Sequence, residues 1–317
     1  MASNEQILIL GSEGQLGSEL SVILQQKHGL QNVICSDIRN GKPEAERRFM
    51  ELDVLDAEAI EQVIISENIT TIYLLAAVLS AKGETNPNFA WKLNMDSLLH
   101  VLNFAVKHKV NRVFWPSSIA AFGPTTPRDF TPQLPYMDPT TVYGISKLSG
   151  ELWCQYFFNR YGLDVRSLRY PGIISWKTPP GGGTTDYAVE IFHEALKKNE
   201  YECFLHENTA LPMMFVDDAI RATIELMEAP AENIKVRTSY NLAAVSFTPG
   251  ELAKAIQKRM PTFKMGYKTD YRQAIADGWP SSIDDSAARK DWGWNHQFDT
   301  EGMVDEMLDN LKKQLLG

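Results

Sequence analysis

The chain has 317 residues, of which 44% are hydrophobic and 22% are charged; this is the balance of a globular protein and excludes a disordered chain, a collagen-like repeat and a coiled coil. Its 31 basic and 40 acidic residues give a net charge of −9, which argues against a nucleic-acid partner or an anionic membrane partner. No apolar run approaches the roughly 20 residues of a membrane span.

The cysteines and the first residues indicate a compartment. The three cysteines, Cys35, Cys154 and Cys203, are odd in number and far apart, which favours reduced thiols over a disulfide framework. The N-terminal residues lack the basic and apolar regions of a signal peptide and lead directly into an apolar run. We therefore expect a cytoplasmic protein.

Short apolar runs alternate with helical patterns from the N-terminus to about residue 115. This alternation is typical of βαβ units, which place parallel strands in one sheet with helices on both faces. The sequence therefore predicts an α/β fold with a doubly wound parallel sheet of the Rossmann type. The expected strands are 7–10, 33–37, 48–52, 71–75 and 113–115, and the expected helices are 14–28, 57–67 and 91–107.

A glycine-rich turn separates the first strand from the first helix. Gly11, Gly14 and Gly17 follow a GxxGxxG spacing. In a dinucleotide site the first glycine allows the tight turn, the second lets the backbone approach the diphosphate, and the third allows close packing of helix on strand. The helix N-terminus then offers N–H groups and a positive dipole to the phosphates. The position of the motif between a strand and a helix favours this interpretation over an ordinary packing turn.

Carboxylates after the next strands refine the expected cofactor. Asp37 ends the second strand, 20 residues beyond Gly17, where a carboxylate accepts hydrogen bonds from the adenosine ribose. Its charge opposes a 2′-phosphate and favours NAD over NADP, although Arg39 could pair with that phosphate. Asp53 follows the third strand, where it could contact the adenine or equally cap the next helix.

A YxxxK motif begins a long helix that we expect over 143–161. The i, i+4 spacing puts Tyr143 and Lys147 on one helix face. An ammonium beside a phenol lowers the pKa of the phenol from about 10, and a phenolate can act as a general base towards a hydroxyl. Ser117 and Ser118 follow a predicted parallel strand, and ligands bind at the carboxyl ends of such strands.

The pattern loosens after an apolar strand at 165–169 and a loop rich in proline and glycine at 178–183. We predict a nucleotide-binding domain formed by residues 1–171 together with about 213–245. A smaller mixed α/β domain, about 172–212 and 246–317, is expected to cap the carboxyl edge of the sheet and bind the substrate. Its helices are expected at 187–198, 249–258 and 300–315. A further helix, expected at 217–227, returns to the first domain.

The chain resembles the extended short-chain dehydrogenase/reductase superfamily along nearly its whole length. The matching residues are Gly11, Gly14, Gly17, Asp37, Leu75, Ala76, Ala77, Asn94, Ser117, Ser118, Tyr143, Lys147 and the 168–172 strand. The resemblance implies that Tyr143 is the general base and that Lys147 modulates its pKa and binds the ribose. It also implies that Ser118, with Ser117 as the alternative, orients the substrate alcohol. With the residues beside these motifs, the expected NAD-binding set is Gly11, Gly14, Gln15, Leu16, Gly17, Asp37, Asp53, Val54, Leu75, Ala76, Ala77, Asn94, Tyr143, Lys147, Tyr170 and Ile173.

Within this superfamily, the chain is most similar to the short-chain family of L-threonine 3-dehydrogenases. The segments that carry this similarity are 76–84, 119–124, 169–175, 180–188, 211–214 and 291–294. The similarity implies oxidation of L-threonine by NAD to 2-amino-3-oxobutanoate, a step of threonine catabolism.

Two other functions stay open at this point. A nucleotide-sugar 4-epimerase or reductase would use the same scaffold. Related dehydratases, however, carry an acid pair where Ile119 and Ala120 stand, and epimerases carry an asparagine where Gly172 stands. A non-catalytic NAD-sensing regulator usually loses the Tyr–Lys pair, which is present here. The six histidines are scattered rather than clustered with cysteines, so we expect no metal.

A site for L-threonine would need residues that bind its carboxylate, its ammonium group and its hydroxyl. Thr184, Thr185 and Asp186 precede the 187–198 helix, where they could bind the carboxylate or simply cap the helix. Ser80 could bind the amino group or lie in a turn, and Trp279 could exclude water or pack between the domains. With the catalytic residues, the expected substrate set is Ser80, Ser118, Tyr143, Thr184, Thr185, Asp186 and Trp279.

Two helices carry apolar residues on more than one face. These are the 91–107 helix, with Phe104, and the 143–161 helix, with Leu152, Trp153, Tyr156 and Phe157. Extended short-chain enzymes commonly pair these helices across a two-fold axis. The resemblance therefore implies a homodimer with an isologous four-helix contact.

Overall fold

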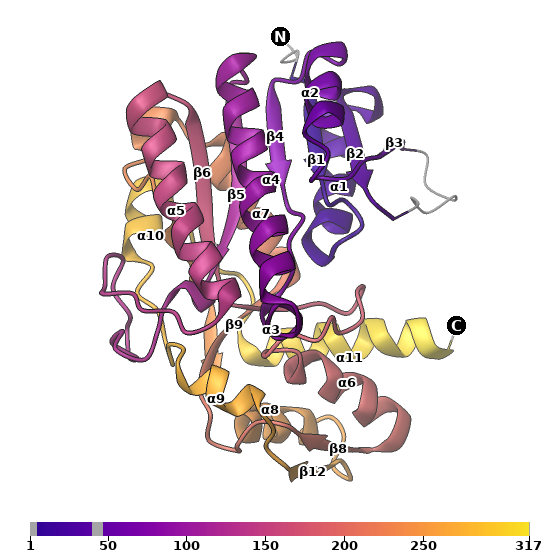
Figure 1. Ribbon diagram of the computed structural model, residues 1–317. Coiled ribbons are helices and arrows are strands. Elements are labelled where there is room, and N and C mark those ends of the chain that lie inside the picture. The colour runs from indigo at the N-terminus through magenta and orange to yellow at the C-terminus, as the bar shows by residue number, and fades with distance from the viewer. Residues whose placement is uncertain (1–4, 40–46, 317) are drawn as a thin grey trace.

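The computed structural model describes residues 5–39 and 47–316, and a parallel sheet forms its larger part (Figure 1). Its strands are β1 Ile7–Leu10, β2 Val33–Asp37, β3 Arg48–Glu51, β4 Thr71–Leu74, β5 Arg112–Ser118, β6 Asp164–Tyr170 and β10 Tyr240–Asn241. The order is β10-β6-β5-β4-β1-β2-β3, and every neighbouring pair is parallel. The predicted doubly wound Rossmann-type sheet is confirmed.

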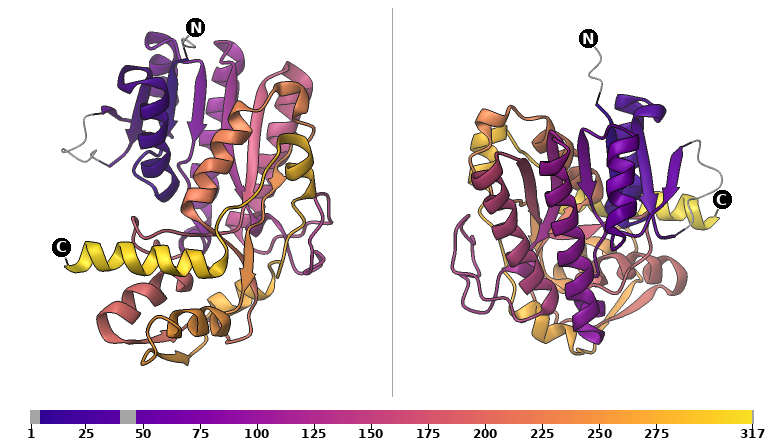
Figure 2. Two further views of the ribbon diagram at one scale, coloured as in Figure 1. Left: turned by 180° about the vertical axis from the view of Figure 1, so that it is seen from behind. Right: turned by 45° about the horizontal axis from the view of Figure 1, so that its top comes forward.

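Helices cover both faces of this sheet (Figure 2). They are α1 Gln15–His28, α2 Ala57–Ser66, α4 Pro87–Lys107, α5 Val142–Tyr161 and α7 Val216–Glu228. Successive β1 side chains point to opposite faces, so that Ile7 and Ile9 join the core under α1 and α7, whereas Leu8 and Leu10 join the core under α2, α4 and α5. Burial on both faces explains why the strands read as continuous apolar runs.

Two boundaries differ from the expectation for physical reasons. A short helix, α3 Ser80–Thr85, precedes α4, and α4 begins at Pro87 rather than near residue 91. The Asn86 side chain accepts a hydrogen bond from Phe89 N at 3.2 Å, and proline is well suited to the first turn of a helix. Strand β5 also continues through Pro116 to Ser118. Its pairing with β4 stops at Phe114, so the missing N–H of Pro116 removes no bond from that ladder.

A smaller part lies at the carboxyl ends of the sheet, in the lower half of Figure 1. It contains the strand trio β11-β9-β7 and the strand pair β12-β8. The strands are β7 Gly172–Ile174, β8 Glu200–Cys203, β9 Leu211–Phe215, β11 Val245–Phe247 and β12 Lys264–Tyr267. Its helices are α6 Tyr187–Lys198, α8 Pro249–Gln257, α9 Arg272–Asp277 and α11 Thr300–Leu316, whereas α10 Ser286–Trp292 contacts β10 of the large sheet. Short 3₁₀ helices are η1 Leu30–Asn32, η2 Ile119–Ala121 and η3 Ala231–Asn233.

Two expectations about composition can be compared with the structure. All three cysteines are free and buried. Within residues 5–39 and 47–316, no helix is long and apolar enough to cross a membrane.

Candidate active site

The glycine-rich turn between β1 and α1 is built as a dinucleotide cradle. Gly11 has a φ of +93°, and a Cβ there would lie 2.6 Å from Ala76 N. A Cβ at Gly17 would lie 2.2 Å from the Gly11 carbonyl oxygen, so the loop and α1 touch only because this residue has no side chain. Gly14 is different, because its Cβ would meet only that carbonyl oxygen, at 3.4 Å. Space is therefore left beside Gly14, and α1 begins there without a side-chain cap, so its N–H groups are available to phosphate.

Asp37 lines this groove as an anion. Its carboxylate accepts hydrogen bonds from Glu13 N at 3.0 Å and Arg39 N at 3.1 Å, and it pairs with the Arg39 guanidinium. Burial alone would raise the pKa of Asp37, but the hydrogen bonds from Arg39 and Glu13 lower it below its ordinary value. Arg39, which left NADP open, is thus held by the carboxylate that opposes a 2′-phosphate.

Asp53 lies along the same groove with Val54. Its carboxylate accepts a hydrogen bond from Leu55 N at 2.9 Å. The alternative that Asp53 caps the next helix is wrong, because Asp56 is the N-cap of α2 and accepts from Ala59 N at 3.0 Å.

Most of the expected site residues meet in two adjoining cavities. A cavity of about 570 Å³ follows the glycine turn past Asp37, Asp53, Val54, Leu75, Ala76 and Ala77. A cavity of about 240 Å³ continues to Gly11, Gly14, Gln15, Leu16, Gly17, Ser80, Ser117, Ser118, Tyr143, Lys147, Tyr170, Ile173, Thr184, Thr185, Asp186 and Trp279. Asn94 lines neither cavity. Its amide bonds Val78 N at 2.8 Å and Ser146 Oγ at 3.2 Å, so it ties the segment after β4 to α5.

Tyr143 and Lys147 lie on the first turns of α5, which the Thr141 side chain caps at Gly144 N, 3.1 Å away. The Tyr143 phenol and the Ser118 hydroxyl line the same cavity, and the serine lowers the pKa of the phenol. The Lys147 ammonium donates to the Pro116 carbonyl oxygen at 2.6 Å and lies over the Trp115 and Tyr143 rings, 4.5 Å and 5.4 Å from their centroids. The arrangement places a phenol, a hydroxyl and an ammonium around one small cavity.

The direction of the Tyr143 pKa shift differs from the expectation. Burial raises the pKa of Tyr143 to about 12, and the hydrogen bond with Ser118 lowers it only in part. Burial also lowers the pKa of Lys147 to about 7, although Cys154 and Glu151 act to raise it. The physical reason is the burial of the Tyr143 phenol, while the Lys147 ammonium donates its hydrogen bond to Pro116.

The two serines, which the sequence left as alternatives, point to different partners. The buried Ser117 hydroxyl donates to Glu151 Oε1 at 2.5 Å. Ser118 accepts from Ala120 N at 3.2 Å and lines the cavity with Tyr143. Glu151 was missed in the sequence, although its spacing of four from Lys147 places it on the same helix face.

The candidate substrate residues converge around the glycine- and proline-rich loop. Ser80 is the first residue of α3 rather than a turn residue, and its hydroxyl lies 3.5 Å from that of Thr184. Asp186 precedes α6, but neither it nor Thr185 caps that helix with its side chain; its carboxylate accepts from Gly182 N at 2.7 Å and Gly183 N at 2.8 Å. Trp279 is 7% exposed and follows α9 into the same cavity.

Gly172 is packed too closely to carry a side chain. A Cβ there would lie 2.4 Å from Met213 Sδ and 2.8 Å from Thr185 Cβ. The position at which epimerases carry an asparagine therefore has no room for an amide side chain.

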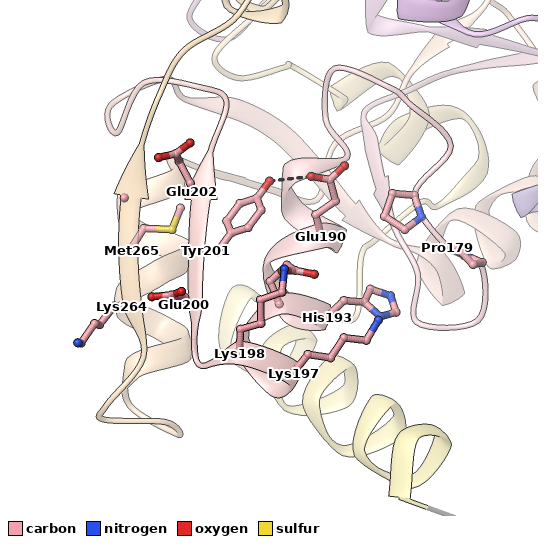
Figure 3. A pocket seen from close by; sticks show the side chains of 13 residues that line it. Pro179, Glu190, His193, Lys197, Lys198, Glu200, Tyr201, Glu202, Lys264 and Met265 are labelled. Carbon is pink, nitrogen blue, oxygen red and sulfur yellow. Dashed lines mark hydrogen bonds and ion pairs between the residues drawn. The ribbon is translucent and has the colours of Figure 1, made fainter.

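A larger cavity lies elsewhere. It measures about 950 Å³ and lies between α6 and the β8–β12 pair (Figure 3). Charges of both signs line it, and Tyr201 donates to Glu190 at 2.9 Å on its wall. None of the predicted site residues lies in it. Among the described residues, no group of three His, Cys, Asp or Glu side chains could hold a metal ion.

A dinucleotide cradle that opens beside a buried Tyr–Lys–Ser cluster defines an oxidoreductase of the extended short-chain type. Residues 7–243 match the NAD dependent epimerase/dehydratase family, and the chain belongs to this family. Its cofactor is NAD, which the cradle at Gly11 and Gly17 and the anionic Asp37 suit.

Similar proteins cover almost the whole chain. The mitochondrial L-threonine 3-dehydrogenase of Bos taurus is 49% identical over 97% of this chain and 83% of its own length. The holo structure of the GalE-like L-threonine dehydrogenase from Cupriavidus necator is 56% identical, covers 97% of this chain and 100% of its own, and has a TM-score of 0.95. A monomeric L-threonine 3-dehydrogenase from a metagenome is 47% identical, covers 98% of this chain and 99% of its own, and has a TM-score of 0.94.

Proposed function

We propose that this protein oxidises L-threonine at its 3-hydroxyl with NAD to give 2-amino-3-oxobutanoate. The observation that carries the proposal is the 240 Å³ cavity, which brings the Tyr143 phenol, the Ser118 hydroxyl and the Lys147 ammonium together. Its size suits a small amino alcohol next to a nicotinamide. The similarity to L-threonine dehydrogenases over nearly the whole chain supports the same substrate.

In this proposal Tyr143 is the general base, and Ser118 orients the substrate hydroxyl beside it. The Tyr143 phenolate takes the hydroxyl proton while a hydride leaves the carbon that bears the hydroxyl. NAD, when bound, accepts that hydride. Lys147 keeps a positive charge beside the phenolate and binds the ribose. Ser117 has no direct part, because its hydroxyl is bound to Glu151.

Other residues of the two cavities would hold NAD and the substrate. For NAD we propose Gly11, Gly14, Gln15, Leu16, Gly17, Asp37, Asp53, Val54, Leu75, Ala76, Ala77, Tyr143, Lys147, Tyr170 and Ile173, with Asn94 acting indirectly through Val78. For the substrate we propose Thr184 and Thr185 on the carboxylate and Ser80 on the amino group. Asp186 shapes the loop, and Trp279 excludes water.

The domain division and the compartment are proposals of the same kind. We infer a nucleotide-binding domain of residues 1–171 and about 213–245, with the remaining residues forming the substrate domain. The strand pair β12-β8, which lies wholly within the proposed substrate domain, supports this division. We also infer a cytoplasmic location, which the three free cysteines support. Fractionation of the source cells with detection of the chain would test the location.

A substrate panel tests the proposed reaction. NADH formation is followed with NAD and L-threonine, and with UDP-glucose both NADH and the sugar-nucleotide products are followed. L-Threonine should be oxidised, whereas UDP-glucose should be neither oxidised nor epimerised. Binding of NAD without turnover of L-threonine would favour a regulator, and turnover of the sugar nucleotide would favour an epimerase.

Replacing Asp37 with alanine should narrow the preference for NAD over NADP. Removal of the carboxylate lifts the repulsion of a 2′-phosphate and frees Arg39, so the ratio of the two kcat/KM values should fall by about tenfold or more. The matched control is Glu51→Ala, because Glu51 is the exposed register partner of Asp37 on β3. A wild-type preference for NADP would contradict this assignment.

Replacing Ser118 with alanine should shift the rising limb of the pH–rate profile to higher pH. The hydrogen bond with Ser118 lowers the pKa of Tyr143, so its loss raises that pKa and delays formation of the phenolate. Ser117→Ala removes only the bond to Glu151, so it should lower the melting temperature and leave the limb in place. A limb that moves in Ser117→Ala instead would reverse the roles of the two serines.

A homodimer through α4 and α5 is a further part of the proposal. Leu152, Trp153 and Tyr156 on α5 are 56%, 38% and 48% exposed, and Trp91 on α4 is 41% exposed. Such a cluster of exposed large apolar side chains is typical of an interaction surface. Phe157 was wrongly placed on this face, because it is buried inside the chain. Phe104 is half-buried against the same core.

Sedimentation tests the dimer. The wild-type chain should sediment as a dimer at micromolar concentration, and Tyr156→Glu should give a folded monomer because it places a charge in the apolar contact. The control is Tyr271→Glu, since Tyr271 is 62% exposed and lies before α9, away from α4 and α5. A wild-type monomer, as in the relative described as monomeric, would refute the dimer.

A further inference from the structure

We infer that the buried Glu151–Arg169 ion pair is a positioning element for Lys147, which holds its ammonium charged and in place beside Tyr143. The inference rests on the proposed function. Both side chains are almost inaccessible, at 1% exposure each. Burial of two charges is costly, so their arrangement calls for a reason beyond packing.

The ion pair is fully bonded and joins four elements. Arg169 Nη2 and Nε donate to the two Glu151 oxygens at 2.6 Å and 2.9 Å. The Ser117 hydroxyl donates to the same carboxylate at 2.5 Å. The remaining Arg169 nitrogen donates to the Gln133 carbonyl oxygen at 2.8 Å and to Asn241 Oδ1 at 3.0 Å. The carboxylate therefore fastens α5 to β5 and β6, and the guanidinium extends the contact to β10.

The strands that the ion pair joins also hold the hydrogen-bond partner of Lys147. Ser117 and Arg169 are register partners on β5 and β6. Pro116, whose carbonyl oxygen accepts the Lys147 ammonium, immediately precedes Ser117, and Ser118 immediately follows it. On α5, Glu151 comes one turn after Lys147 and Tyr143 comes one turn before it, all on one helix face. A shift of Glu151 against Ser117 would therefore move Lys147 against Pro116.

The charge of Glu151 also acts directly on Lys147. Three residues of α5 face the ammonium, namely Tyr143, Glu151 and Cys154. The Trp115 ring and the Pro116 carbonyl oxygen face it from β5. Arg169 of β6 lies behind the Glu151 carboxylate. The buried residues of α4, which packs on α5, are all neutral, and its His100 is half-buried. Burial lowers the pKa of Lys147, and the carboxylate of Glu151 opposes this shift.

Two variants should move the same titration in opposite directions. In Glu151→Gln the ammonium loses its anion and faces an unpaired guanidinium, so the limb of the pH–kcat profile that Lys147 sets should move to lower pH by about one unit and kcat should fall. In Arg169→Met the Glu151 carboxylate faces Lys147 alone, so the same limb should move to higher pH. Glu151→Asp keeps the charge at a shorter reach, should fold, and should shift the limb in the direction of Glu151→Gln by a smaller amount.

The measurement is the pH dependence of kcat for L-threonine oxidation, normalised to the folded fraction from thermal unfolding, with NAD affinity by calorimetry alongside. A purely structural pair would lower the folded fraction in each variant and leave the limb at the wild-type pH. The inference would be overturned if the limb stayed at the wild-type pH in Glu151→Asp and in either Glu151→Gln or Arg169→Met, whichever of the two folds. A wild-type chain that does not oxidise L-threonine would refute the proposed function instead.

Discussion

Replacing Tyr143 with phenylalanine should lower kcat for L-threonine oxidation by about 10²–10⁴, the usual contribution of a positioned acid or base. The change removes only the hydroxyl that meets Ser118 and keeps the ring under Lys147. The affinity for NAD should therefore stay close to that of the wild type. Steady-state kinetics and calorimetric titration with NAD measure the two effects separately.

The matched control for this variant is Tyr170→Phe. Tyr170 lines the same cavity, but its hydroxyl bonds the buried Thr223 rather than facing the reacting groups. Tyr170→Phe should lower the melting temperature and keep kcat within a few-fold of the wild type. Near-full activity of Tyr143→Phe would show that another group takes the proton.

Replacing Gly17 with alanine should weaken NAD binding by about 10²-fold or more, because an added methyl group would overlap the backbone that forms the cradle. The new Cβ would lie 2.2 Å from the Gly11 carbonyl oxygen and 2.8 Å from Ser12 Cα. Neither atom belongs to a flexible side chain, so α1 and the loop must separate and the N–H groups of α1 must leave the diphosphate. Calorimetric titration with NAD measures the loss.

Gly266→Ala is the matched control for the cradle. Gly266 lies on β12, and a Cβ there would meet only the Tyr201 carbonyl oxygen, at 3.9 Å. NAD affinity should be unchanged, and the free energy of unfolding should change by about 0.5 kcal/mol or less. Equal NAD affinity in Gly17→Ala and in the wild type would place the diphosphate elsewhere.

The fold could be predicted because its signals are local. Apolar runs, glycine turns and helical periodicity each lie within one element, and the strands and long helices form where those patterns are. Even the contacts of Gly11 and Gly17 follow from a motif with a fixed geometry. The short helix at Ser80 had no such signal, because it is a single turn and a half between a strand and the Asn86 cap.

The details of the site depend on contacts between distant segments, which no local pattern contains. Successive side chains of a strand point to opposite faces, but both faces of β5 are buried, so the sequence alone could not decide between Ser117 and Ser118. The YxxxK spacing likewise places Lys147 near Tyr143 without revealing that its ammonium bonds Pro116. The direction of the Tyr143 pKa shift follows from burial, so it needed the structure.

The central claim is that a hydride leaves C3 of L-threonine for NAD. L-Threonine deuterated at C3 tests it most directly, with mass spectrometry of the nicotinamide product and of the amino-acid product. We predict that the deuterium appears in the reduced nicotinamide and is absent from 2-amino-3-oxobutanoate. Reduced nicotinamide without deuterium, or no reduced nicotinamide from L-threonine at all, would contradict the claim.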